Sequence, residues 1–182
     1  TQEAMSGLLS VSGYPGGASS PTGVKYGDPN GGVFGAVAAL SALWHRRRTG
    51  EGQLIDLSQR EANIFTLPDP IFEYSMNGRT AKGHGNRHPR YAPRGCYRSE
   101  SDDMWVAIDV ETDDQFKALC EIMKTPELAK DPRFAQASLR KGNEDALDEL
   151  IENWTKQRTS YQAMHLLQDA GIPAGAVLTN QQ

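Results

Sequence analysis

The spacing of apolar positions in the first half of the chain predicts one long helix. Over 33–44 apolar residues fall nearly all round a helical projection, so we expect a helix over 33–48 that is buried rather than amphipathic. Three arginines at 46–48 would lie in its last turn, where cations stabilise the negative end of a helix, and Gly50 is placed to end it. Residues 6–31 are rich in Gly, Ser and Pro, which favours turns and loop before this helix.

After this helix the pattern predicts a short strand and two further helices. The apolar run 54–57 is a strand candidate, and Ser58 followed by Glu61 has the spacing of a capping box that opens a helix. Asp69 stands between two prolines and is placed to cap a short helix over 70–77. Helix, strand and helix in this order suggest an α/β layered architecture.

In the second half, the pattern predicts a hairpin, three helices and a closing strand. The segments 96–99 and 104–110 flank a polar turn, which is typical of a β-hairpin. The three expected helices begin at the capping residues Thr112, Asn143 and Thr159. A last strand is expected over 174–178.

A change of amino-acid composition at 78–95 separates these two halves. This stretch is rich in Gly and Pro, and loops of such length are often functional. The sequence therefore predicts a partial α/β domain over 1–77, a glycine-rich loop or linker over 78–95, and a small α+β domain with a short antiparallel sheet over 96–182.

Composition and charge narrow the class of protein. The chain has 182 residues, of which 38% are hydrophobic and 23% charged, an ordinary balance for a soluble domain. Its formal net charge of -4 gives no electrostatic footprint for nucleic acid, and no apolar stretch is long enough to cross a bilayer. Cys96 and Cys120 do not make a disulfide framework and suggest free thiols. We expect a cytoplasmic globular protein with neither nucleic-acid nor membrane partners.

Asp28 is the first candidate for chemistry. It stands in the run Gly-Asp-Pro-Asn-Gly-Gly at 27–32, directly before the expected helix. One role is that of helix cap or turn residue, since a carboxylate favours the positive end of a helix. The other is that of nucleophile, because the flanking glycines clear room for a substrate and N–H groups at the helix start stabilise an adjacent oxyanion. The residues alone leave both roles open.

The stretch 82–88 is the second candidate. His84 and His88 are four residues apart, but this spacing aligns metal ligands only on a helix, and the stretch is too rich in glycine for one. No cysteine or carboxylate cluster accompanies them, so a metal site is not expected. A mobile lid over an active site and a flexible connector both fit the composition.

Several motifs, taken in order, resemble the family III CoA-transferases of the CaiB/BaiF type, which include formyl-CoA transferase and carnitine CoA-transferase. The resemblance extends over nearly the whole chain from about residue 7. The motifs are the Gly-Asp run at 27–32, the segment 48–58, the loop pieces 85–89 and 92–95, Asp-Pro-Arg-Phe at 131–134, Arg140 with Asn143, and Ala-Gly-Ile-Pro-Ala-Gly at 170–175.

The resemblance implies a chemistry centred on Asp28. In the family, the aspartate of the Gly-Asp motif attacks the thioester of an acyl-CoA and forms an aspartyl anhydride. CoA thiolate returns to give an aspartyl-CoA thioester, and an acceptor carboxylate then takes the CoA. Coenzyme A is thus a substrate, and no metal or permanently bound cofactor is needed. The resemblance further assigns contacts with substrate or CoA, including shielding of the anhydride by the glycine loop, to Gly27, Gly31, Gly83, Gly85 and Asn86.

The resemblance also implies an architecture. Family members have a Rossmann-like large domain and a small domain, they are much longer than this chain, and they form interlocked homodimers. The chain therefore corresponds to an internal part of a family member: a piece of the large domain that carries Asp28, followed by most of the small domain.

Two alternatives to the transferase stay open at this point. One is an α-methylacyl-CoA racemase of the same superfamily, in which the equivalent of Asp28 acts as an acid or base. The other is a truncated chain that is not catalytic.

Overall fold

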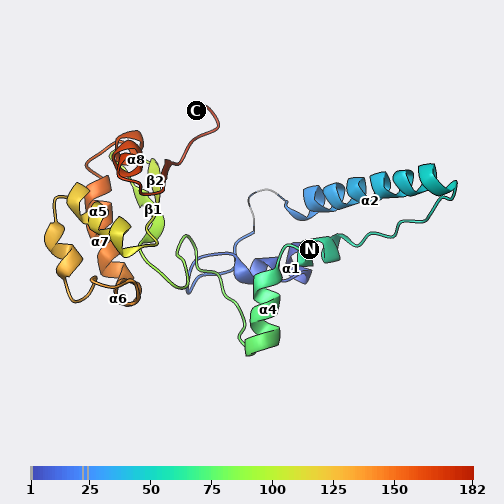
Figure 1. The fold of residues 1–182 in the computed structure, drawn as a ribbon, viewed down its shortest axis with the longest axis horizontal. Helices are drawn as coiled ribbons and strands as arrows, with labels where there is room; N and C mark the ends of the chain where they lie inside the picture. Colours follow the sequence, from blue (N-terminus) through green and yellow to red (C-terminus); the bar gives the residue numbers. More distant parts are fainter. Residues whose placement is uncertain (1, 22, 24) are drawn as a thin grey trace. The chain divides into compact units, whose positions relative to one another are not determined.

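In the computed structural model, which describes residues 2–21, 23 and 25–182, the chain forms helices and one small antiparallel sheet (Figure 1). It divides into two compact units, one up to Gly85 and one from Asn86. Each unit is described by itself below.

The first unit is dominated by the 23-residue helix α2 (Gly27–Thr49). The helix begins six residues before the expected position, and Asp28 lies in its first turn while Tyr26 occupies the N-cap. Pro29 does not prevent this early start. The N–H groups of the first turn of a helix have no intrahelical acceptor, so a proline there costs no hydrogen bond. The expected end is confirmed, since Gly50 follows the helix in a left-handed conformation with φ of 80°.

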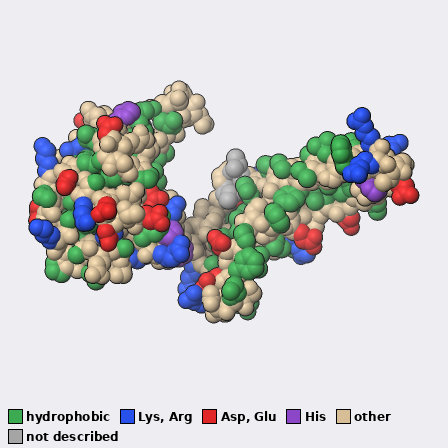
Figure 2. All heavy atoms as spheres, in the orientation of Figure 1, with side chains coloured by type: hydrophobic (Ala, Val, Ile, Leu, Met, Phe, Trp, Pro, Cys, Tyr) green, Lys and Arg blue, Asp and Glu red, His purple; other side chains and the backbone are tan. Residues whose placement is uncertain are grey.

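The expectation that α2 is buried is wrong for this chain. Its large apolar side chains are mostly exposed, with Leu40 exposed to 67% and Trp44 to 63%. Figure 2 shows apolar side chains along this helix. The apolar residues surround the helix, but the described residues offer few partners for them, such as Phe65, whose ring meets that of Phe34 edge-on at 5.4 Å.

The expected strand at 54–57 is also absent from the structure. Among the described residues up to Gly85 there is no strand at all, so this run has nothing to pair with, and Leu54 is 94% exposed. The unit therefore consists of helices: α1 (Gln2–Met5), the 3-10 helix η1 (Leu8–Val11), α2, α3 (Gln59–Ile64) and α4 (Pro68–Asn77).

The predicted helix starts around α3 and α4 are partly confirmed. The Ser58 hydroxyl caps α3 by accepting a hydrogen bond from the N–H of Glu61 at 3.3 Å. Helix α4 begins at Pro68, two residues before the expected start, and its N-cap is Leu67. Asp69 lies in the first turn of α4 and is not its cap, because a proline at the first helical position is compatible with the helix.

The second unit contains the sheet. Strands β1 (Arg94–Arg98), β2 (Trp105–Asp109) and β3 (Ala174–Ala176) are antiparallel in the order β1-β2-β3. Ala107 pairs with Cys96 on one side and with Gly175 on the other. The predicted hairpin is confirmed, and β3 ends two residues earlier than expected.

The helices of this unit cover a closed apolar core. They are α5 (Asp113–Ile122), the 3-10 helix η2 (Pro126–Lys130), α6 (Ala137–Gly142), α7 (Glu144–Thr155) and α8 (Ser160–Asp169). Thr112 and Thr159 form complete capping boxes at the starts of α5 and α8, as predicted. Asn143 is the N-cap of α7, but its side chain makes no capping bond and donates to the carbonyls of Arg133 and Leu139 instead.

Candidate functional site

Asp28 lies at the second position of α2 with its side chain exposed. Its carboxylate makes no hydrogen bond or ion pair with any residue that the structure describes. It stands at the positive end of a long helix, where a negative charge is favoured. The carboxylate is therefore reachable from solvent and is not used as a cap.

The backbone N–H groups around Asp28 mostly donate to backbone carbonyls already. The N–H of Asp28 donates to the carbonyl of Lys25 at 3.2 Å, and the N–H of Asn30 donates to that of Tyr26 at 3.1 Å. Pro29 has no N–H to offer. These groups do not support the expectation that N–H groups at the helix start stabilise an oxyanion, and what remains here is the helix dipole.

Gly27 and Gly31 are the two buried residues of α2. A Cβ added to Gly27 would lie 3.0 Å from Nδ2 of Asn63 and 3.0 Å from Oε1 of Gln2. A Cβ on Gly31 would lie 2.8 Å from Cγ of Gln59. In this chain the space that the two glycines leave is filled by side chains of α1 and α3, which pack against the start of α2.

Side-chain amides connect this first turn to α3. Nδ2 of Asn30 donates to the carbonyl of Ala62 at 2.8 Å and to Oδ1 of Asn63 at 3.1 Å. Nδ2 of Asn63, a fully buried residue, has no hydrogen-bond partner among the described residues. A buried donor left in this state costs about 1–3 kcal/mol. Sequence reasoning missed both asparagines, although Asn30 stands inside the Gly-Asp run.

Gly83 and Gly85 approach the segment 12–14 of the same unit closely. The N–H of Gly85 donates to the carbonyl of Gly13 at 2.8 Å. A Cβ on Gly83 would lie 2.6 Å from that carbonyl oxygen, and one on Gly85 would lie 2.6 Å from the ring of Tyr14. Gly85 also has a φ of 60°, which side-chain-bearing residues rarely adopt. The local packing requires glycine at both positions, and Asn86 follows as the first residue of the second unit.

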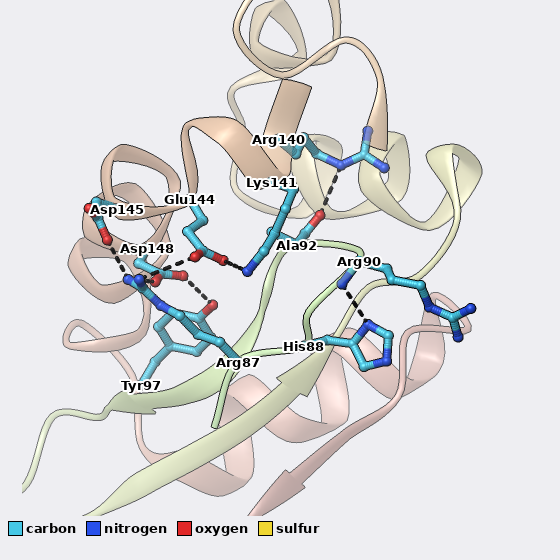
Figure 3. A network of polar contacts seen from close by, with 10 residues as sticks. All are labelled: Arg87, His88, Arg90, Ala92, Tyr97, Arg140, Lys141, Glu144, Asp145 and Asp148. Atoms are coloured by element: carbon cyan, nitrogen blue, oxygen red, sulfur yellow. Dashed lines mark hydrogen bonds and ion pairs between the residues drawn. The ribbon is translucent and has the colours of Figure 1, made fainter. Parts of the chain in front are cut away.

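In the second unit, the loop residue Arg87 lies among three carboxylates at the start of α7 (Figure 3). Its guanidinium contacts Glu144 at 3.3 Å, Asp145 at 2.6 Å and Asp148 at 2.7 Å. The hydroxyl of Tyr97 donates to the other oxygen of Asp148 at 2.7 Å. Burial first, and then the Asp148 charge, raise the pKa of Tyr97 well above its ordinary value, so the phenol stays neutral.

Arg140 fixes the same loop from α6. Its fully buried guanidinium donates to the carbonyl of Ala92 at 3.0 Å, to that of Phe134 at 3.2 Å, and to the carboxylate of Asp113 at 2.7 Å. Arg87 and Arg140 together tie the segment after Asn86 to the helices of the second unit, so this part of the loop is not a free connector. Sequence reasoning did not predict these contacts, since each joins residues far apart in the chain.

The surroundings of His88 favour the neutral imidazole. Its Nδ1 accepts a hydrogen bond from the N–H of Arg90 at 3.3 Å, and its ring lies 4.0 Å from that of Tyr91. Partial burial, followed by the charges of Arg94 and Arg90, lowers the pKa of His88. Because Nδ1 accepts, the ring proton is on Nε2.

Other chemistries find little support in the part of the chain that the structure describes. It contains no group of three or more His, Cys, Asp or Glu side chains arranged to hold a metal ion. Both cysteines are free, and burial raises the pKa of Cys96 and that of Cys120, the latter to about 11, so neither is a reactive thiolate near neutral pH.

No helix among the described residues is long and apolar enough to cross a membrane.

Comparison with known proteins gives one consistent result. The family model described as CoA-transferase family III matches residues 1–182. The chain is 34% identical to the succinyl-CoA–D-citramalate CoA-transferase of Chloroflexus aurantiacus, over 99% of this chain and 44% of that protein. It is also 34% identical to the acetyl-CoA:oxalate CoA-transferase of Acetobacter aceti, over 97% of this chain and 45% of that protein.

A solved structure agrees with these sequence matches. The crystal structure of a CAIB/BAIF family protein from Brucella suis superposes on this chain with a TM-score of 0.91 at 34% identity, covering 98% of this chain and 47% of that one. The chain thus spans about half the length of the relatives it matches.

Proposed function

The chain belongs to CoA-transferase family III, and on this premise we propose that its protein moves CoA from an acyl-CoA to a carboxylic acid, with Asp28 as the nucleophile. The observation that carries the assignment to Asp28 is its setting in the structure. Its carboxylate is exposed, without a partner among the described residues, and located at the positive end of α2. A capping or ion-paired carboxylate would instead have its oxygens occupied.

The proposed reaction proceeds through covalent intermediates on Asp28. A carboxylate oxygen of Asp28 attacks the thioester carbonyl, the C–S bond breaks, and CoA leaves as a thiolate, which gives a mixed anhydride. The thiolate then attacks the aspartyl carbonyl, releases the donor acid as a carboxylate, and leaves an aspartyl-CoA thioester. The acceptor carboxylate repeats these two steps in reverse, which yields the new acyl-CoA and regenerates Asp28. No net proton or electron is consumed.

The names of the relatives indicate a class of acceptor. The acids in these names include D-citramalate and oxalate. A third is mesaconate, in the name of the Haloarcula hispanica enzyme that is 31% identical over 96% of this chain. All three are small dicarboxylic acids. We therefore propose a dicarboxylic acid as acceptor, acyl-CoA as donor and transient CoA ligand, and no permanently bound cofactor. The residues proposed to line the CoA and substrate site are Gly27, Gly31, Gly83, Gly85 and Asn86.

The setting of the site in the whole protein is a further part of the proposal. The first unit is proposed to be part of a Rossmann-like large domain, and the protein to be a homodimer. The exposed apolar side chains of α2 support both ideas, because such a surface is normally covered by protein. The free cysteines support a cytoplasmic location, where thiols stay reduced.

The experiment that tests the nucleophile uses the protein in the form in which the cell makes it. Incubation with an acyl-CoA and hydroxylamine converts the anhydride or thioester on Asp28 to a hydroxamate, which peptide mass spectrometry locates. Asp28→Asn is expected to abolish this label and to lower CoA transfer by at least about 10³-fold, as expected for loss of a nucleophile.

Asp69→Asn is the matched control. Asp69 is also exposed and also occupies the second position of a helix, in α4, so the same change there should leave turnover unaltered. A label on another residue, or full activity of Asp28→Asn, would refute the assignment. Exchange of the acyl α-proton without CoA transfer would indicate a racemase instead.

A further inference from the structure

The first turn of α2 rests on a group of buried or half-buried side-chain amides. Asn30 binds Asn63, and Gln2 binds Gln59, so that residues of α1, α2 and α3 are joined below the turn that carries Asp28. Asn63 is the member of this group whose side chain is fully buried.

The orientation of the Asn63 amide follows from its partners. The carbonyl of Ala62 can only accept, so the group of Asn30 that faces it at 2.8 Å must be the NH₂. The same NH₂ lies 3.1 Å from Asn63, which must therefore present its oxygen to Asn30. The Nδ2 of Asn63 consequently faces the other way, toward Gly27, where a Cβ would lie 3.0 Å from it.

Asn63 thus holds the turn at both ends. It accepts a hydrogen bond from Asn30 and lies against the backbone of Gly27. Residues three and four apart lie on the same face of a helix, so residues 27, 30 and 31 form the face of this turn that packs against α3. Asp28 lies about 100° further round the helix and is exposed, as the structure shows.

On the basis of the function proposed above, we infer that Asn63 is a positioning residue that fixes the first turn of α2 and thereby the direction of the Asp28 carboxylate. Its contribution to stability alone does not explain an asparagine here. Its buried Nδ2 has no partner among the described residues, and an apolar side chain of similar size would avoid that cost. A rigidly held nucleophile, in contrast, gains rate directly, because a misplacement of about 1 Å can cost 10²-fold.

The test is a double-mutant cycle in steady-state CoA transfer by the complete protein. Asn63→Ala and Asn30→Ala each remove the same hydrogen bond. Each is expected to lower kcat by about 10- to 100-fold, with KM for acyl-CoA nearly unchanged. Both changes break the bond between Asn30 and Asn63, although Asn30→Ala also removes the bond to the carbonyl of Ala62. The loss in the double variant should therefore be clearly smaller than the product of the two single losses.

Leu67→Ala is the matched control, since Leu67 is a buried residue of the same unit outside the amide group. It should lower the melting temperature while kcat per folded molecule stays at the wild-type value. Three outcomes would overturn the inference. The kcat losses of the two single variants could multiply in the double variant, the effect could appear in KM for acyl-CoA, or the loss of kcat could be no larger than that of Leu67→Ala. If Asn63→Ala does not fold, Asn30→Ala judged against the same control decides the question.

Asp28→Asn, measured in parallel, separates this inference from the proposed function. Full activity of Asp28→Asn refutes the nucleophile and the positioning role with it. An inactive Asp28→Asn together with wild-type kcat in Asn63→Ala and Asn30→Ala refutes the positioning role alone.

Discussion

The two units of the chain use apolar residues in opposite ways. In the second unit, Val106, Phe116 and Ile151 are almost completely buried in one core. In the first unit, Leu40 and Trp44 are mostly exposed, and the buried hydrophobic residues among those described up to Gly85 are Ala62 and Leu67. An apolar helix contributes to a core only where the same unit supplies another apolar surface for it to pack against. Helix α7 packs against the sheet, whereas α2 has apolar residues on all sides and few partners for them in its own unit.

Two buried side chains, one from each unit, differ in how their polar groups are satisfied. The guanidinium of Arg140 donates to two carbonyls and one carboxylate. The amide of Asn63 uses its oxygen and leaves its nitrogen without a partner among the described residues. The second unit leaves three buried atoms of its own without a partner among the described residues, namely Oδ1 of Asp109, Oγ1 of Thr125 and Nε1 of Trp154. The contrast between Arg140 and Asn63 therefore does not rank the units. The exposed apolar side chains of the first unit are the reason to expect it to be the less stable of the two.

The most direct way to break this comparison is to separate the units. Residues 86–182, expressed alone, are expected to fold and to unfold cooperatively with heat, because their core is complete. Residues 1–85 alone are expected to show no cooperative transition, because most of their large apolar side chains have no covering partner. Near-UV circular dichroism during thermal unfolding measures both. A cooperative transition in 1–85, or none in 86–182, would contradict the comparison.

The same leucine-to-alanine change should have different costs in the two units. Leu147→Ala empties a site in the core of the second unit and is expected to cost about 2–5 kcal/mol of unfolding free energy. Leu40→Ala removes an exposed side chain and should change the stability of this chain by no more than about 0.5 kcal/mol. Denaturant unfolding of the two variants measures the difference. Equal costs would mean that Leu40 is buried in solution.

Much of the second unit was predictable because its signals are local. The capping boxes at Thr112 and Thr159 each involve residues three apart, and the hairpin follows from two apolar runs around a polar turn. The first unit was predicted less well. The run 54–57 has the composition of a strand but no strand to pair with. The start of α2 was missed because the Gly, Ser and Pro content of 6–31 favoured turns and loop.

The candidate site was predictable only in part, for the same reason. The Gly-Asp run drew attention to Asp28 through sequence alone. The contact between Asn30 and Asn63 joins residues 33 positions apart, and the contacts of Arg87 with α7 join residues 57 to 61 apart. No periodicity or short motif encodes such pairings, which exist only once the helices have packed.

A smaller effect is expected from the hydrogen bonds of Arg140 in the second unit. Arg140→Lys keeps the charge but cannot reach two carbonyls and a carboxylate at once, so a buried carbonyl loses its donor. We expect a loss of about 1–3 kcal/mol in the unfolding free energy of residues 86–182. Arg90→Lys makes the same change at an exposed position and should cost less than about 0.5 kcal/mol. If Arg140→Lys also lowered the unfolding free energy by less than about 0.5 kcal/mol, the hydrogen bonds of Arg140 would not be maintained in solution.

The smallest expected effect concerns acid stability, through His88. Its pKa in the folded unit is lowered, chiefly by partial burial and secondly by Arg94 and Arg90. The unfolded chain, with an ordinary histidine pKa of about 6.5, then binds more protons than the folded one below that pH. The contribution of the neutral imidazole is thus complete above about pH 6.5 and is lost as the pH falls through the pKa of the folded state.

His88→Gln should therefore lose less stability than the wild type when the pH is lowered from 7 to 5, because glutamine has no proton to gain. Unfolding of residues 86–182 at several pH values measures this, and an NMR titration of the His88 ring measures the pKa itself. Arg94→Gln should raise that pKa only partly, because burial is the larger cause and remains. A pKa at or above 6.5 in the folded wild type would show that the ring is more hydrated than its contacts with Tyr91 and Arg90 indicate.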